Sequence, residues 1–334
     1  MNLYPITIEN NDMILNKVHI HEMNFKSLNL KECNVEEFVR KNSNDIFGDE
    51  ESFIIIGQQV INSENGRSDL VAVDEDGSLV LIEIKRDEED IKGRKEPFEF
   101  QAIRYAANFA KIKNIDEVCE SVYCHYIEKY ASEYNLDNIS PLELAKRTLF
   151  EFLKENNSMK EFNKKQRIIL IASSFDKQTL SAVAWLIENG VDICCYTINP
   201  VEINEQIYIN MEKKLPVPSI DEFYVGIKSR DDKPILTSTT NRKARNSSLP
   251  KMQRLFDEQC ISQGDLICIR RGFNKEENIA EIIDSKYVKY KNEVLTINEW
   301  AKAVTGWGVV NIYENTILLK EGKTLHEIRL GLED

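Results

Sequence analysis

The sequence lacks a hydrophobic run that could form a membrane-spanning helix, because no apolar stretch approaches the roughly 20 residues that a bilayer requires. The N-terminal residues MNLYPITIENND contain neither a basic nor an apolar segment, so they do not resemble a secretory signal peptide. From these two absences we expect a cytoplasmic protein without a membrane partner.

Histidine is scarce, and cysteine pairs of the CxxC type are absent. The four histidines are scattered and form no cluster of zinc ligands, so a structural zinc site is not expected. Cys194 and Cys195, two of the seven cysteines, are adjacent within an apolar run. We interpret the cysteines as buried free thiols, with a metal or redox role as the less favoured alternative.

Positive charge is in the minority, since 43 Lys and Arg stand against 56 Asp and Glu, and the net charge is −13. Such a chain does not coat nucleic acid with its whole surface, although a local basic groove is compatible with the total. The hydrophobic share of 42% excludes a disordered chain. The length of 334 residues predicts two domains.

Strand-like and helix-like segments alternate over residues 31–211, which predicts an α/β domain with a mixed sheet covered by helices. Short strands and turns are expected before it, over residues 1–30, and the first helix is expected to follow an N-cap at Asn34. The further elements expected are a strand at 52–61, a hairpin within 65–87, a helix at 96–112, a mostly helical segment at 115–157, and a strand–helix–strand unit at 167–173, 176–190 and 191–198.

The composition changes after residue 211. Residues 212–250 are interpreted as a linker, and the segment 227–254 contains eight Lys or Arg and two Asp. A solvated linker explains this basic segment, and a tether that holds DNA is the alternative. Residues 251–334 are expected to form a small α+β domain with short strands and a helix around INEWAKAV.

The stretch NGRSDLVAVDEDGSLVLIEIKRD predicts a buried hairpin in which Asp69, Glu83 and Lys85 occupy strand positions where the pattern calls for apolar residues. With the turn at residues 75–77, pairing outward places Asp69 opposite Glu83. Lys85 shares the face of Glu83, because side chains alternate along a strand. Two carboxylates about 5 Å apart repel each other, so a positive group between them is expected.

A divalent cation meets this requirement, because Mg²⁺ binds one or two carboxylates together with waters and a substrate phosphate. Such an ion polarises the phosphate and lowers the pKa of a water for attack, and Lys85 would orient that water. A solvated hairpin end and a structural ion-pair cluster are the alternatives. The apolar residues on both faces of the two strands favour a buried site over a solvated end.

The spacing from Asp69 to Glu83-Ile84-Lys85 resembles the PD-(D/E)xK nuclease signature, although the proline of that motif is missing. The wider stretch GRSDLVAVDEDGSLVLIEIKRD is similar to the form seen in NucS-type endonucleases, and QAIRY is similar to the QxxxY element of the RecB-like branch. Over roughly residues 30–200, the resemblance implies a restriction-endonuclease-like core and an endonuclease that depends on Mg²⁺ or Mn²⁺.

The resemblance also implies roles for single residues. Asp69 and Glu83 would hold the metal, Lys85 would assist the attacking water, and Gln101 and Tyr105 would support the site and contact the substrate. A further metal ligand in the first helix falls on Glu36, with Glu37 as the alternative. The expected DNA contacts are Arg67, Arg86, Arg94 and Lys95, with Lys92 beside them, and a mixed-charge loop is the alternative interpretation of residues 92–95.

The C-terminal segment loosely resembles the RAMA domain found beside restriction and modification enzymes. The resemblance rests on Gly264-Asp265, Trp300, Gly306-Trp307 and the pair Leu325 and Arg329, and it departs from the pattern at residues 296–298. It implies a module that binds DNA or a partner protein. Core packing of Trp300 and Trp307 is the favoured alternative to base stacking.

Taken together, the sequence predicts a metal-dependent DNA endonuclease that serves restriction, phage defence or repair, with a homodimer and partner proteins of such a system implied by the resemblance. One alternative is a DNA-binding module that has a nuclease fold and does not cleave on its own. The other is an assembly protein that uses the acidic end of the sheet as an ion-pair interface.

Overall fold

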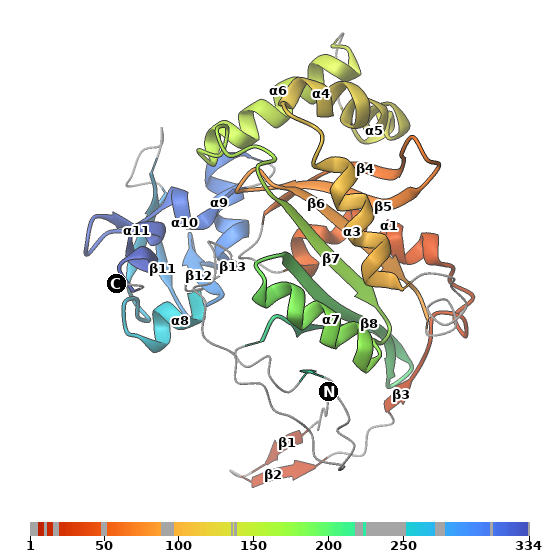
Figure 1. Ribbon diagram of the computed structural model, residues 1–334. Coiled ribbons are helices and arrows are strands. Elements are labelled where there is room, and N and C mark those ends of the chain that lie inside the picture. Colours follow the sequence, from red (N-terminus) through yellow and green to blue (C-terminus); the bar gives the residue numbers. More distant parts are fainter. Residues whose placement is uncertain are drawn as a thin grey trace, which may run out of the picture. The chain divides into compact units, whose positions relative to one another are not determined.

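The chain has a mixed α/β fold in which helices flank a mixed sheet (Figure 1). The computed structural model describes residues 6–9, 12–15, 20–47, 52–87, 97–134, 136, 139–217, 223–224, 252–270, 278–307 and 310–332. By their internal contacts the residues group into two units. The first unit comprises Met1–Phe38, Ile82–Arg104 and Ile168–Leu236, and the second comprises Val39–Leu81, Tyr105–Arg167 and Thr237–Asp334.

The larger sheet has the strand order β3-β8-β7-β6-β5-β4, and β9 pairs with β8. Antiparallel pairing joins β3 to β8, β4 to β5 and β8 to β9. The strands are β3 (Ile20–Glu22), β4 (Phe53–Ile61), β5 (Arg67–Asp74), β6 (Leu79–Lys85), β7 (Gln166–Ala172), β8 (Asp192–Ile203) and β9 (Gln206–Leu215). The strands expected from the sequence at 52–61, in the hairpin, at 167–173 and at 191–198 are therefore confirmed, and β8 continues five residues beyond the expected end.

The strands β5 and β6 are buried along almost their whole length, from Ser68 to Asp74 and from Leu79 to Lys85. Neither strand has a solvated face, because the side chains on both of its faces are buried. This is the pattern expected for strands that are covered on both sides. Asp69, Glu83 and Lys85 therefore lie inside the fold, on strands whose other residues are mostly apolar, and the interpretation as a solvated hairpin end is wrong.

The turn between β5 and β6 forms where the sequence predicts it. The backbone N–H of Asp74 donates to the carbonyl oxygen of Ser78 at 3.1 Å, and the N–H of Ser78 donates to Asp74 Oδ1 at 2.7 Å. Gly77 has a φ of +80°, and a Cβ atom there would lie 3.0 Å from the carbonyl oxygen of Ser158. The turn therefore requires glycine at this position.

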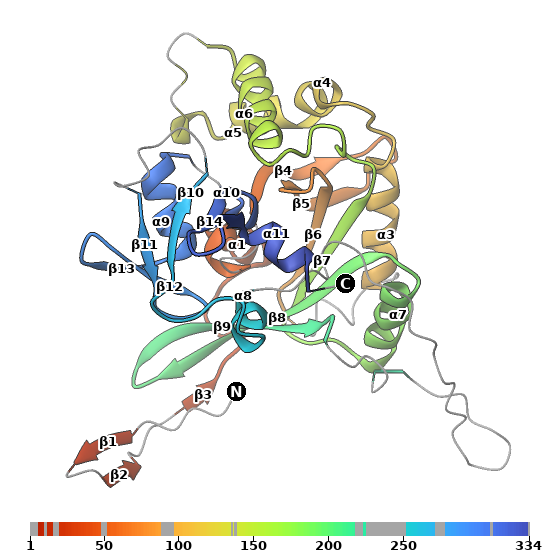
Figure 2. The same cartoon turned by 90° about the vertical axis from the view of Figure 1, so that its left-hand side faces the viewer.

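Helices cover the larger sheet on both faces. Figure 2 shows α3 and α7 on one face and α1 on the other. On the first of these faces, the rings of Phe98 and Phe175 stack with centroids 6.3 Å apart. The helices are α1 (Glu32–Ile46), α3 (Phe98–Phe109), α4 (Ile115–Val118), the π-helix η1 (Cys119–Tyr123), α5 (Cys124–Lys129), the 3₁₀-helix η2 (Ala131–Glu133), α6 (Pro141–Glu155) and α7 (Lys177–Glu188).

The helix α1 begins two residues before the expected N-cap, so the prediction of Asn34 as that cap is wrong. Asn34 is the third residue of the helix, and its Oδ1 atom accepts a hydrogen bond of 2.8 Å from the backbone N–H of Lys31, just before the helix. A third helical residue makes this contact in a capping box. The same side chain therefore stabilises the helix start from inside the helix instead of from its edge.

The N-terminal segment contributes a separate pair of strands and one strand of the larger sheet. β1 (Ile6–Glu9) and β2 (Asp12–Leu15) pair with each other, whereas β3 lies at an edge of the larger sheet. His21 in β3 is exposed.

The C-terminal segment forms an α+β layer with its own hydrophobic core. Its antiparallel sheet has the order β13-β12-β11-β10-β14-β15. Trp300 is fully buried in this core and Trp307 packs against it, so core packing accounts for both. The elements are α8 (Met252–Asp257), β10 (Leu266–Ile269), β11 (Ala280–Ile282), β12 (Tyr287–Tyr290), β13 (Glu293–Thr296), α9 (Ile297–Thr305), α10 (Ile312–Asn315), β14 (Thr316–Leu318), β15 (Lys323–Thr324) and α11 (Leu325–Leu330).

The cysteines are free thiols, and five of the seven are buried. Cys33 is exposed and Cys260 is half-buried, so the expectation of burial is wrong for Cys33. Across the described part of the chain, none of the helices has the length and apolar character needed to cross a membrane.

Candidate functional site

The end of β6 carries two buried charged side chains of the first unit. Glu83 is 0% exposed and Lys85 is 1% exposed. The Lys85 Nζ atom lies 3.3 Å from Glu32 Oε1 and donates a short hydrogen bond to the carbonyl oxygen of Ile84. It also lies 5.4 Å from the centroid of the Phe98 ring, where a cation is attracted by the ring face. These contacts compensate for part of the cost of burying the ammonium group.

The helix α1 presents two glutamates one turn apart. Glu32 and Glu36 are four residues apart and lie on one side of the helix. Glu36 is buried, as a metal ligand inside the fold would be, whereas the alternative Glu37 is only half-buried. Because Glu32 contacts Lys85, this side of α1 faces the charged end of β6.

Arg86 and Asp87 connect the end of β6 to the segment that leads into α1. The Asp87 carboxylate accepts hydrogen bonds from the backbone N–H groups of Phe25 and Lys26, both at 3.2 Å. Arg86 donates from Nη1 to the carbonyl oxygen of Leu30 at 2.9 Å, and its Nε lies 3.0 Å from Asp87 Oδ2. Arg86, which the sequence suggested for DNA contact, is thus engaged with the protein's own backbone.

In the second unit, Asp69 lies on β5 with 7% of its surface exposed. The side-chain amide of Gln59, on the neighbouring strand β4, donates to Asp69 Oδ1 at 3.4 Å. The guanidinium of Arg67 donates to Gln59 Oε1 at 3.5 Å. The structure therefore brings Asp69 and Arg67 together through a residue that sequence reasoning did not select.

Tyr105 on α3 supports the beginning of β5. Its hydroxyl oxygen accepts a hydrogen bond of 3.1 Å from the backbone N–H of Arg67. A Cβ atom at Gly66 would lie 2.8 Å from the Tyr105 ring, so only glycine lets the ring approach the chain at this point. Gln101 lies one turn before Tyr105 on the same helix and is half-buried. The predicted pair thus lies on one side of α3.

The basic residues that the sequence suggested for DNA contact differ in their surroundings. Arg67 is exposed, whereas Arg86 is half-buried. Lys92, Arg94 and Lys95 lie outside the described residues.

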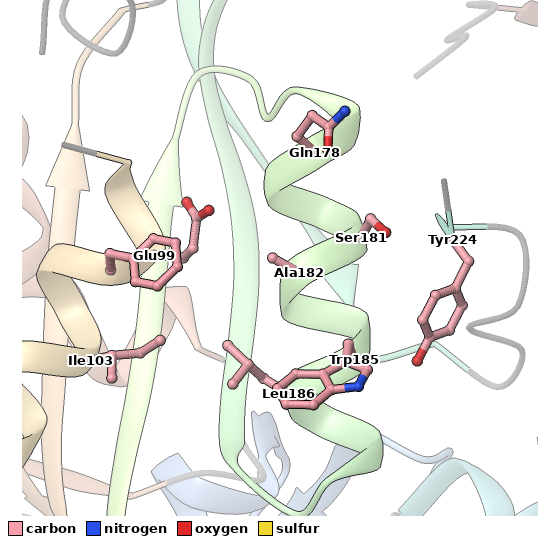
Figure 3. A pocket seen from close by; sticks show the side chains of 9 residues that line it. Glu99, Ile103, Gln178, Ser181, Ala182, Trp185, Leu186 and Tyr224 are labelled. Atoms are coloured by element: carbon pink, nitrogen blue, oxygen red, sulfur yellow. The ribbon is translucent and has the colours of Figure 1, made fainter. Parts of the chain in front are cut away.

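A pocket of about 390 Å³ opens between α3 and α7 in the first unit (Figure 3). Its walls are largely apolar, and Tyr224 points toward the exposed ring of Trp185 across it. Glu99 at its edge is buried and accepts a hydrogen bond of 3.2 Å from the hydroxyl of Thr179, and the Tyr224 hydroxyl donates to Glu188 at 2.5 Å. Neither Glu83 nor Lys85 is among the residues that line this pocket.

The buried thiols are poorly suited to nucleophilic catalysis. Burial raises the pKa of Cys119 from 9.0 to about 12, and it raises the pKa of Cys195 well above its usual value. The reactive form of cysteine is the thiolate, which these two residues do not form near neutral pH. Their environment therefore agrees with the interpretation as structural thiols.

Sequence reasoning missed two residues of this region, Glu32 and Gln59. Glu32 was missed because the helix was expected to begin after Asn34, which left this glutamate outside it. Gln59 has no local signal, because it is a polar residue in a strand whose partner register is known only from the fold.

The chain matches no model of a known protein family. It also matches none of the curated proteins. Within the ranges that the structure describes, no group of three or more His, Cys, Asp or Glu side chains is close enough to hold a metal ion.

Proposed function

We propose that the protein is a Mg²⁺- or Mn²⁺-dependent DNA endonuclease with a restriction-endonuclease-like core, as in the PD-(D/E)xK nucleases that it resembles. The burial of Asp69, Glu83 and Lys85 on two neighbouring strands carries this proposal, with 7%, 0% and 1% of their surfaces exposed. The order of the three residues along the hairpin is the order that the nuclease signature requires.

The donor set fits a hard divalent cation, because Asp69 and Glu83 offer carboxylate oxygens and Mg²⁺ commonly takes one or two carboxylates beside waters and phosphate. Glu36 is the additional ligand that the resemblance suggests, and it is buried. Because the described residues contain no group of three or more His, Cys, Asp or Glu that could hold a metal ion, the ion is proposed to bind Asp69 and Glu83. The cation, when bound, supplies Lewis-acid activation of the phosphate and of the attacking water.

The remaining side chains have roles that follow from their contacts. Lys85 orients the water and offsets the negative charge that develops on the phosphate, and Glu32 keeps its ammonium group in place at 3.3 Å. The water oxygen forms the new bond to phosphorus as the ester bond breaks. Tyr105 supports the backbone at Arg67, whose exposed guanidinium contacts a DNA phosphate.

The C-terminal layer and the basic segment before it would direct the nuclease to its target. The resemblance to a RAMA domain supports DNA or a partner protein of a restriction, defence or repair system as the ligand of this layer. Because Trp300 belongs to the hydrophobic core, its ring is not the group that stacks on a base. A homodimer, implied by NucS-type relatives, remains part of the proposal.

Cleavage of a nucleic-acid panel tests this function. The panel contains plasmid, linear duplex, methylated, mismatched and single-stranded DNA together with RNA, and each is incubated with Mg²⁺ and with Mn²⁺. We expect the wild type to cut, and Lys85→Ala to lower the rate about 10²- to 10⁴-fold, the usual contribution of a group that assists proton transfer. Lys111→Ala, which removes an exposed lysine, is the matched control and retains the wild-type rate.

Two outcomes contradict the proposal in different ways. If Asp69→Ala and Lys85→Ala cut as fast as the wild type, the activity belongs to another site. If the wild type binds DNA in a gel-shift experiment but cuts nothing with either metal, the protein is a DNA-binding module with a nuclease fold.

A further inference from the structure

Gln59 has an unusual backbone conformation for a residue inside a strand. Its φ is +55°, in the left-handed region, although β4 is otherwise extended from Phe53 to Ile61. A residue with a side chain rarely adopts this conformation, and such residues concentrate at functional sites. The position of Gln59 in the sheet therefore merits a functional explanation.

The left-handed residue lies directly across from Asp69. Gln58 pairs with Leu70 and Val60 pairs with Ser68, so Gln59 and Asp69 occupy the positions between these two pairs. An irregular residue within a strand changes the direction in which its side chain points. Here the side chain reaches Asp69 on the neighbouring strand.

Gln58, the residue before Gln59, makes hydrogen bonds with different partners. Gln58 Oε1 accepts hydrogen bonds from Lys129 Nζ at 2.7 Å and, at a shorter distance, from the Tyr130 hydroxyl. Both residues lie at the end of α5. Gln59 donates from Nε2 to Asp69 Oδ1 at 3.4 Å and accepts from Arg67 Nη1 at 3.5 Å. Gln58 and Gln59 therefore contact different parts of the structure, and Gln59 links the Asp69 carboxylate to the exposed Arg67.

We propose that Gln59 is a positioning residue, whose amide fixes the orientation of the Asp69 carboxylate toward a divalent cation and of Arg67 toward the substrate phosphate. This inference rests on the proposed function. The amide donates to Asp69 Oδ1, and a hydrogen bond of this kind restricts the rotation of the carboxylate. Partners of this kind orient metal ligands, and their removal typically weakens metal affinity by 10- to 100-fold.

A calorimetric titration of the purified full chain with Mn²⁺ tests the inference. Gln59→Gly removes the amide and retains a backbone that adopts positive φ freely. We expect this variant to bind Mn²⁺ about 10- to 100-fold more weakly than the wild type, with a melting temperature that is not lowered. A merely structural role of Gln59 would instead lower the melting temperature and leave the Mn²⁺ affinity unchanged.

Two control variants separate the side chain from the backbone. Asn204→Gly replaces another left-handed residue, with φ of +50° in the turn between β8 and β9, and Gln58→Ala removes the neighbouring amide. Both are expected to bind Mn²⁺ with wild-type affinity. Equal weakening in Gln59→Gly and in either control would overturn the specific role of Gln59.

The inference and the proposed function fail in distinguishable ways. If Asp69→Ala abolishes Mn²⁺ binding and Gln59→Gly binds as the wild type does, the metal site stands and the role of Gln59 is refuted. If the wild type itself does not bind Mn²⁺, the proposed metal site fails, and the inference about Gln59 fails with it.

Discussion

Lys85 places an ammonium group where only 1% of the side chain is exposed, beside Glu32 and the ring of Phe98. The side chain of its ion-pair partner Glu32 is 34% exposed, so water screens the charge that a Lys85 substitution would leave behind, but the substitution also removes a fully buried side chain. A Lys85 variant can therefore lose activity through lost folding. For this reason its cleavage rate is interpretable only beside its melting temperature.

Tyr105 gives a prediction about a single hydroxyl group. Tyr105→Phe retains the ring that packs beside Gly66 and removes the acceptor of the Arg67 N–H. We expect the free energy of unfolding to fall by about 1 kcal/mol, the net worth of a typical hydrogen bond, and DNA cleavage to slow because Arg67 is held less firmly. Urea denaturation and the cleavage assay measure the two effects.

The control for this prediction is Tyr208→Phe, which removes an exposed hydroxyl that contacts only Gln206 two residues away among the described hydrogen bonds. It should leave the midpoint of denaturation and the cleavage rate unchanged. A cleavage rate of Tyr105→Phe equal to that of the wild type would show that the hydroxyl does not support the site.

Single residues differ in how well the sequence reveals them. The burial of Asp69, Glu83 and Lys85 could be predicted, because each interrupts an apolar strand. The conformation of Gln59 could not, because nothing in the local sequence of β4 marks this residue for a positive φ.

At the scale of elements, hydrogen bonds join the segment before α1 to the residues that follow β6. Asp87 binds two backbone N–H groups of this segment, and Arg86 binds the carbonyl oxygen of Leu30. The two residues directly after Lys85 therefore hold the segment that leads into α1, the helix that carries Glu32 and Glu36, against the end of β6.

Asp87→Ala tests this connection. The substitution leaves the N–H groups of Phe25 and Lys26 without their acceptor, and Phe25 is buried. We expect the free energy of unfolding to fall by about 1–3 kcal/mol, the cost of a buried donor without a partner. We also expect faster amide hydrogen exchange over residues 25–36 than in the wild type. Urea denaturation and hydrogen-exchange mass spectrometry provide the two measurements.

Asp45→Ala is the control, because it removes an exposed aspartate of the same helix. Its stability should lie within about 0.5 kcal/mol of the wild type, as for most surface substitutions. Unchanged exchange over residues 25–36 in Asp87→Ala would contradict the role assigned to Asp87.

The elements themselves followed largely from the sequence. Strands with continuous β-branched and apolar runs, such as β4 and β7, form where the periodicity predicts them. The start of α1 was misplaced because Asn34 stabilises the helix from its third position, and a residue type favoured at N-caps does not reveal which position it occupies. Because of this error, the contact between Lys85 and Glu32 was not predicted.

At the scale of the molecule, the mixed α/β architecture was predictable and is confirmed. Alternating patterns identify strands and helices, and buried strands require cover on both faces, so the layered arrangement follows from the sequence. The restriction-endonuclease-like core and the opposition of Asp69 and Glu83 stay predictions. They depend on the relative placement of strands, which local patterns do not encode.

The proposed function requires that Asp69 and Glu83 together hold a divalent cation. Anomalous diffraction from crystals grown with Mn²⁺ tests it most directly, because the signal locates the ion without assumptions about activity. We predict an anomalous peak with oxygen atoms of both carboxylates at about 2.0–2.2 Å, near the distances of hard divalent cations. A peak at other residues, or no peak at saturating Mn²⁺, would contradict the account.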